Sequence, residues 1–390
     1  MKILILEDCK DKIDKITEII GSVCADSTIA IAECYSDFIG VSNREVFDLI
    51  VADLLLPMFM DGKDPVNIST QLLGNLRNIE CQNYYTPVIA VTSFDELAEE
   101  SFAELNKFDI NILTYKSDSD EWIESFKRKI QSCIPVPSYD FVIVCALDKE
   151  ADAYEECGFN VGIEFIFEGI TCKNIDIKDK KGVIVVPPRM GLVNSAIISS
   201  RVIDLFKPKL ICMSGICAGI EGNANIYDVV IPDICHQHDS GKWTNEGFVT
   251  ESYAIQLEHK TRLDVARIIK DKAFLKAIAN GIVLDKNEFP EGQDKAAFKV
   301  YLAPTSSGSA VVADNSMLAE ITSQHRKATA FEMESYAMYE AARQSIIAPK
   351  YFSAKAVVDN GNSHKGDDFH RVACLVSAKT VYELIDNLLA

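Results

Sequence analysis

The chain has 390 residues, with 39 lysines and arginines against 58 aspartates and glutamates, which gives a formal net charge of -19. This length predicts two domains, each large enough to bury its own core. The negative charge argues against a protein that grips the phosphate backbone of nucleic acids. The 12 cysteines are scattered and form no C-x-x-C pair, which indicates core thiols in a reducing compartment rather than disulfides or zinc ligands.

Short apolar runs alternate with amphipathic stretches in the first third of the chain. Strands are expected at 3–6, 49–52, 88–91 and 112–115, and helices at 11–20 and 120–130. No basic leader or membrane-spanning apolar stretch precedes or interrupts them, so a cytoplasmic protein is expected. The alternation predicts a doubly wound α/β domain over residues 1–134.

The proline-containing segment 133–138 interrupts any helix and predicts a linker. A new first strand is expected at 141–145, followed by strands at 183–186, 210–213, 229–231, 299–303 and 351–358. Helices are expected at 194–206, 261–280, 317–323, 334–344 and 372–389. A second α/β domain is therefore predicted over residues 139–390.

Acidic residues follow two predicted strands of the first domain. Glu7 and Asp8 end the first strand and Asp53 ends another, so their carboxylates should meet at one edge of a parallel sheet. Mg²⁺ suits such oxygen ligands, and it would leave Asp53 as a nucleophile toward a phosphoryl group. Thr92 and Lys116 would bind the added phosphate.

Taken singly, these residues would be ordinary solvated side chains. Their order and spacing together resemble a response-regulator receiver domain, which has a flavodoxin-like fold. The resemblance implies phosphorylation of Asp53 by an upstream histidine kinase or phosphotransfer protein, with Mg²⁺ at Glu7, Asp8 and Asp53. It therefore implies a switch in the first third of the chain.

Three carboxylates in the second domain suit cleavage of a purine N-glycosidic bond: Glu150, Glu334 and Asp359. Departure of the base leaves an oxocarbenium-like ribosyl group, which requires a protonated base on one side and a positioned nucleophile on the other. Each residue also has a structural interpretation. Glu334 suits a helix N-terminus, Asp359 suits a turn, and Glu150 suits an exposed first turn.

Four motifs, at 145–150, 213–219, 331–334 and 357–359, resemble the purine nucleoside phosphorylase and methylthioadenosine nucleosidase superfamily. The resemblance implies that Asp359 is the general acid for purine N7, that Glu334 holds the ribose hydroxyls and that Glu150 activates water. No cofactor is implied for the cleavage. The implied substrate-binding residues are Met333, Gly215, Ile216, Cys217, Val311, Val312 and Lys355.

Cationic residues gather near these motifs, although the chain as a whole is acidic. They are Arg189, His236, His238, His364-Lys365 and His370-Arg371. Such enrichment suggests an anionic ligand, with Arg189 as a substrate contact, and solvated loop charge is the alternative. A metal pair at His236 and His238 lacks a third ligand at a familiar spacing.

The pairing of a receiver with this nucleosidase domain resembles the effectors of the bacterial Detocs antiphage defence systems. That resemblance implies a phosphorelay-controlled homo-oligomer that hydrolyses ATP and related adenine nucleotides to adenine and ribose 5′-triphosphate. Three alternatives stay open from the sequence. They are a methylthioadenosine or adenosine nucleosidase, a phosphate-dependent phosphorylase, and a non-enzymatic nucleotide sensor, which would not need the three carboxylates.

Overall fold

A computed structural model describes residues 1–62, 64–251, 253–291, 293, 297–312, 319, 321–322, 325–360 and 368–390. The chain folds as two compact units, Met1–Val136 and Pro137–Ala390, and the division falls within the predicted linker. All of the cysteines are free thiols. Among the described helices, none is both long and apolar enough to cross a bilayer.

The first unit contains a five-stranded sheet. Its strands are β1 (Lys2–Leu6), β2 (Thr28–Ala32), β3 (Leu49–Ala52), β6 (Val88–Thr92) and β7 (Asn111–Thr114). They lie in the order β2-β1-β3-β6-β7, and every adjacent pair is parallel. The carboxyl ends of β1, β3 and β6 therefore meet at one edge, as the doubly wound prediction requires.

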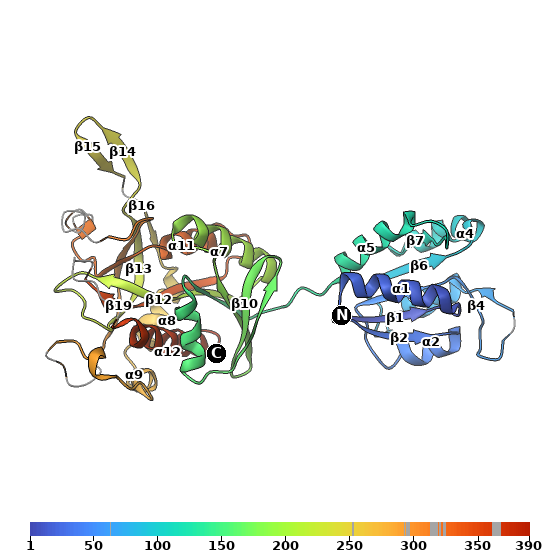
Figure 1. Cartoon of the computed structure of the whole chain (residues 1–390), viewed down its shortest axis with the longest axis horizontal. Helices are drawn as coiled ribbons and strands as arrows, with labels where there is room; N and C mark the ends of the chain where they lie inside the picture. The colour runs from blue at the N-terminus through green and yellow to red at the C-terminus, as the bar shows by residue number, and fades with distance from the viewer. Residues whose placement is uncertain are drawn as a thin grey trace. The chain divides into compact units, whose positions relative to one another are not determined.

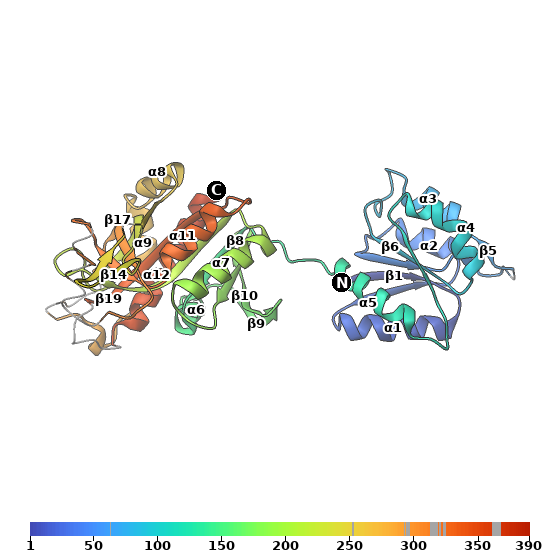
Figure 2. The same cartoon turned by 90° about the horizontal axis from the view of Figure 1, so that it is seen from above.

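Helices cover both faces of this sheet (Figure 2). They are α1 (Lys10–Val23), α2 (Tyr35–Ser42), α3 (Ser69–Leu76), α4 (Asp95–Asn106) and α5 (Glu121–Cys133). Ile3 and Ile5 of β1 pack with α1 and α5 on one face, whereas Leu4 and Leu6 pack with the other three helices. The short strands β4 (Leu55–Leu56) and β5 (Val66–Asn67) pair outside the sheet.

The second unit is built on a ten-stranded mixed sheet (Figure 1). Its strands are β8 (Phe141–Cys145), β9 (Val161–Phe167), β10 (Ile170–Ile177), β11 (Lys180–Val186), β12 (Leu210–Gly219), β13 (Val229–Gln237), β16 (Tyr253–Gln256), β17 (Val300–Ser307), β18 (Ala330–Glu332) and β19 (Lys350–Asp359). The strand β12 runs parallel to both β8 and β19, so their carboxyl ends lie at the same edge. A hairpin of β14 (Gly241–Thr244) and β15 (Gly247–Thr250) projects from the sheet.

The described helices of the second unit are α6 (Asp148–Glu156), α7 (Leu192–Phe206), α8 (His259–Ile268), α9 (Lys272–Ala279), α11 (Ser335–Gln344) and α12 (His370–Leu388), with a 3₁₀ turn at Lys286–Glu288. The single helix expected at 261–280 is wrong, because α8 ends and α9 begins within it. The side chain of Asp271 accepts a hydrogen bond from the Ala273 N–H at 2.9 Å and so caps a new helix. The helix expected at 317–323 lies largely outside the described residues.

Candidate active site

A cavity of about 390 Å³ lies at the carboxyl ends of β8, β12 and β19. Its walls bring together Glu150, Glu334 and Asp359, which are far apart in the sequence. The predicted substrate-binding residues on its walls are Ile216, Cys217, Met333, Val311 and Val312. Further lining residues are Ala146, Leu147, Lys149, Met190, Ala218, Ala310, Phe331, Glu332, Val358 and His370. The cavity is thus apolar with a few convergent polar groups, as small-molecule sites commonly are.

Glu150 is held rigidly in the wall, in the first turn of α6 and with only 2% of its surface exposed. Its carboxylate accepts hydrogen bonds from the backbone N–H groups of Leu147 and Ile216, both at 3.0 Å. Burial raises the pKa of Glu150 to about 7, an effect that Lys355 opposes and Glu334 reinforces. The interpretation of Glu150 as an exposed acid is therefore wrong, and the group is poised to exchange a proton near neutral pH.

Gly215 makes room for this carboxylate. A Cβ atom added at position 215 would collide with Oε1 of Glu150, and the backbone there has a φ of 152°. The side chain of Ser377 fixes the same point, because its Oγ accepts from the Gly215 N–H at 2.8 Å and donates to the Ala354 carbonyl at 2.8 Å. Gly215 therefore serves the site by close approach to Glu150 and does not itself line the cavity.

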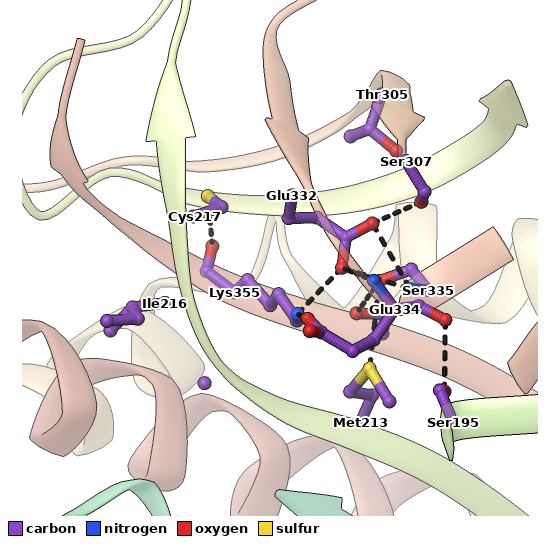
Figure 3. Close-up of polar contacts among 12 residues, drawn as sticks. Ser195, Met213, Ile216, Cys217, Thr305, Ser307, Glu332, Glu334, Ser335 and Lys355 are labelled. Atoms are coloured by element: carbon purple, nitrogen blue, oxygen red, sulfur yellow. Dashed lines mark hydrogen bonds and ion pairs between the residues drawn. The ribbon is translucent and has the colours of Figure 1, made fainter. Parts of the chain in front are cut away.

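A buried lysine joins the two glutamates of the 331–334 motif (Figure 3). The Nζ atom of Lys355 lies 2.6 Å from Oε2 of Glu332 and 2.6 Å from Oε2 of Glu334. Burial alone would lower the pKa of Lys355, but the two carboxylates raise it well above its ordinary value. Lys355 was predicted to contact substrate. The structure instead places it behind the cavity wall, because both carboxylates draw its ammonium inward.

Glu332 and Glu334 have different tasks. The carboxylate of Glu332 accepts from the N–H groups of Glu334 and Ser335, at 3.0 and 2.9 Å, and so caps α11. Ser307 also donates to it, and burial is outweighed by Lys355, so the pKa of Glu332 is lowered. Glu334 accepts from the Gly191 N–H at 3.0 Å and gives no capping bond. The helix-terminus role considered for Glu334 thus belongs to Glu332, whose function the sequence did not reveal.

Asp359 stands at the end of β19 and lines the cavity. The pairing of β19 with β12 shifts in register just before it, so that Ala218 faces Asp359 rather than Val358. Such an irregularity re-aims side chains at strand ends next to active sites. Asp359 therefore closes the side of the cavity at which Val358 and Ala218 also lie.

The predicted basic residues lie in different parts of the second unit. His370 lines the cavity with Lys149, and the Lys149 Nζ and His370 Nδ1 atoms are 2.6 Å apart. Arg371 instead pairs with Glu288 at 2.7 Å, and Arg189 is exposed beside the cavity-lining Met190. The residues away from the cavity are His236, which lies near His325, and His238, which lies 3.0 Å from the Ser306 hydroxyl. His364 and Lys365 lie outside the described residues.

The acidic edge of the first unit holds Glu7 and Asp53, both buried, whereas Asp8 is exposed. Between the two buried carboxylates lies Lys12 of α1, which the sequence did not indicate. Thr92 is buried at the end of β6, and Lys116 is exposed with its Nζ 3.8 Å from Asp95. Within the described parts of the chain, no group of three or more histidines, cysteines, aspartates or glutamates is arranged to hold a metal ion.

Comparison with known proteins identifies the family of the second unit. The pattern of the phosphorylase superfamily matches residues 140–390. The chain belongs to the phosphorylase superfamily. A methylthioadenosine/S-adenosylhomocysteine nucleosidase from Colwellia psychrerythraea, solved with adenine, shares the fold at 16% identity and a TM-score of 0.51, over 65% of this chain and 98% of that one. The predicted α/β nucleosidase-type fold of the second unit is thereby confirmed.

Two relatives by sequence extend this result. The uncharacterized protein y4jS of Sinorhizobium fredii is 24% identical over an alignment of 420 positions, which covers 100% of this chain and 100% of that protein. The ATP nucleosidase Cap17 of Escherichia coli is 25% identical over 194 residues, which are 48% of this chain and 38% of Cap17. The family and Cap17 support the predicted enzyme class, an N-glycosyl hydrolase.

We predict that kcat/KM for purine release rises with pH and levels off above about 7. Glu150 can take a proton from water only when ionised, and each pH unit below its pKa lowers the ionised fraction about tenfold. A pH–rate profile measured by adenine release tests this, and Glu150→Gln should lower kcat by about 10²–10⁴-fold. Glu155→Gln, on the same helix and exposed, should keep the wild-type profile. Full activity of Glu150→Gln would remove Glu150 from the chemistry.

Proposed function

We propose that the second unit hydrolyses the N-glycosidic bond of ATP or a related adenine nucleotide, releasing adenine and ribose 5′-triphosphate. The observation that carries this proposal is the position of Glu150, which is buried in the cavity wall with a pKa of about 7. A general base with a pKa near the working pH combines the right protonation state with sufficient basicity. The similarity to the ATP nucleosidase Cap17 supports an adenine nucleotide as substrate.

Each carboxylate has one role in the proposed reaction. Asp359 gives a proton to purine N7 as the C–N bond breaks, and Glu150 takes a proton from the water whose oxygen bonds to the anomeric carbon. Glu334 binds the ribose hydroxyls, with its carboxylate fixed by Gly191 and Lys355. Met333 packs against the sugar between them. No cofactor is needed for these steps.

The Lys149 ammonium, which donates a hydrogen bond to the neutral ring of His370 at 2.6 Å, favours a substrate with phosphates over a thioether or a free nucleoside. Lys149 and His370 both line the cavity, and neither is needed for contact with an uncharged 5′ group. Lys149 precedes Glu150 in the first turn of α6, and a phosphate of the substrate would bind to it there. Charge-assisted hydrogen bonds from these groups would hold its oxygens.

The cavity charge also bears on a phosphate-dependent phosphorylase. Such an enzyme must bind free phosphate next to the anomeric carbon, where Glu150 stands. An ionised carboxylate in that position repels a phosphate anion. Water is the nucleophile that this arrangement accepts, so hydrolysis is favoured over phosphorolysis.

We further propose that the first unit controls this activity. Asp53 would accept a phosphoryl group from a histidine kinase or phosphotransfer protein, with Thr92 and Lys116 binding the phosphate. Phosphorylation of Asp53 would reorganise a homo-oligomer and so complete the hydrolase site. The resemblance to Detocs effectors implies this control, in a cytoplasmic protein. An enzyme that destroys ATP must be inactive by default, and an attached receiver provides such control.

Mass spectrometry of the products tests the substrate directly. Purified enzyme is incubated with ATP, AMP, adenosine and methylthioadenosine, with and without a phosphoryl donor and inorganic phosphate. Adenine and ribose 5′-triphosphate are expected, independently of added phosphate, and Asp359→Asn should fold yet lose cleavage. Adenine from methylthioadenosine alone would contradict the nucleotide substrate, and a ribose 1-phosphate product would indicate a phosphorylase.

Replacement of Lys149 or of its partner His370 should separate nucleotides from nucleosides. We expect Lys149→Met to lower kcat/KM for ATP by about tenfold, mostly through KM, because one charge-assisted contact is worth roughly 1.4 kcal/mol. Adenosine cleavage should be unchanged by the same substitution, and His370→Gln should behave alike. The exposed Lys260→Met provides the matched control. Equal losses for ATP and adenosine would show that these residues do not bind phosphate.

Regulation is tested at the phosphoacceptor. Asp53→Ala should keep the basal hydrolase rate and lose any increase produced by the cognate kinase and ATP, or by a small-molecule phosphoryl donor. Asp61→Ala, another acid of the first unit and exposed, is the control. A complete response in the Asp53→Ala protein would exclude Asp53 as the switch.

A further inference from the structure

A buried lysine occupies the acidic edge of the first unit. Lys12 has only 2% of its side chain exposed. Its Nζ atom lies 2.7 Å from Oε2 of Glu7, 2.7 Å from Oδ2 of Asp53 and 2.7 Å from the carbonyl oxygen of Val91. These oxygens belong to the ends of β1, β3 and β6, so one ammonium group joins three neighbouring strands.

The remaining bonds of the two carboxylates are also satisfied. The other oxygen of Asp53 accepts from the Leu54 N–H at 2.6 Å, and Oε1 of Glu7 accepts from the Cys9 N–H at 3.0 Å. The Lys12 ammonium donates hydrogen bonds to Oδ2 of Asp53 and to the Val91 carbonyl, and its contact with Oε2 of Glu7 is an ion pair. The ring of Tyr115 lies 5.6 Å from Nζ and adds a cation–π contact. The pocket thus already holds one cation, from the chain itself, against its two buried carboxylates.

This arrangement does not fit the Mg²⁺ site that the sequence predicts. Mg²⁺ needs oxygen ligands at about 2.1 Å in octahedral geometry, and strong negative charge around it. One oxygen of Glu7 and one of Asp53, Oε2 and Oδ2, are already in contact with the Lys12 ammonium. The third predicted ligand, Asp8, is exposed. An ammonium and a divalent cation cannot bind these oxygens at the same time, because the two cations repel each other and occupy the same volume.

We propose that Lys12 is the resident cation of the acidic pocket, and that a divalent cation enters only by displacing it. Two buried carboxylates without a counter-ion are costly, so some cation must be present, and Lys12 supplies one from the chain itself. The same ion pair engages Oδ2 of Asp53, an oxygen that a phosphoryl group would need. Departure of Lys12 thus becomes a step that precedes both metal binding and phosphorylation. This deepens the proposed switch, on whose phosphoacceptor it rests.

The test measures metal binding to the full-length chain and needs no hydrolase activity. Mn²⁺ is titrated into the protein, and free Mn²⁺ is followed by electron paramagnetic resonance. The wild type is compared with Lys12→Met and with Lys10→Met, which removes an exposed lysine from the same helix. Lys12→Met should gain one site with a Kd at least about tenfold lower than any the wild type shows, since a competing charge is removed. Lys10→Met should match the wild type.

Two further variants assign the site and guard against misfolding. Glu7→Gln added to Lys12→Met should abolish the gained site, which locates it at this edge and not elsewhere on an acidic protein. If circular dichroism shows that Lys12→Met does not fold, Lys12→Gln takes its place, because the amide retains hydrogen-bond donors without the charge. A wild-type Mn²⁺ site that Glu7→Gln removes, with the affinity seen in the lysine variants, would overturn the proposal. Such a result would leave the proposed hydrolase chemistry untouched.

Discussion

The ion pairs of Lys355 with Glu332 and Glu334 are the constraint on which the active site depends. Burying a single charge costs several kcal/mol, so neither glutamate could stay ionised at this depth without the lysine. The pairing lets one carboxylate cap α11 while the other reaches the cavity. Because all three groups share one network, the start of α11 and the cavity wall at Glu334 are positioned together. Replacement of Lys355 by a neutral residue would leave two buried carboxylates without a counter-ion.

In both units, one buried lysine is paired with two carboxylates near the edge of the sheet. Parallel strands bring carboxylates to their carboxyl ends, which is useful for chemistry and unfavourable for stability. In the second unit the charge is offset by Lys355, and the remaining acid, Glu150, responds by holding its proton more tightly. In the first unit Lys12 offsets Glu7 and Asp53. A lysine with a long apolar stem can serve in both places, since it carries its charge inward from a strand or helix whose backbone lies elsewhere.

Most of the elements were predictable from the sequence, because apolar periodicity is a local signal, whereas the cavity carboxylates were predictable through the resemblance of four motifs to a known superfamily. The bounds of β8 match the predicted run 141–145, and α11 begins one residue later than expected. The break before Asp271 was missed, since helical periodicity continues through it and only the cap separates α8 from α9. The pairing of Lys355 with Glu332 and Glu334, and that of Lys12 with Glu7 and Asp53, were not predicted. Both depend on partners distant in the chain, which spacing does not reveal.

The contact between Gly215 and Glu150 has an evolutionary consequence. The carboxylate fills the volume that any larger residue at position 215 would need, so while Glu150 is present only glycine is accommodated. Loss of Glu150 to a smaller residue would free this volume, but the φ of 152° would still disfavour a side chain at position 215. Position 215 is thus restricted to glycine by two independent constraints, its packing against Glu150 and its own backbone conformation. A lineage that loses one of these constraints is still held to glycine by the other.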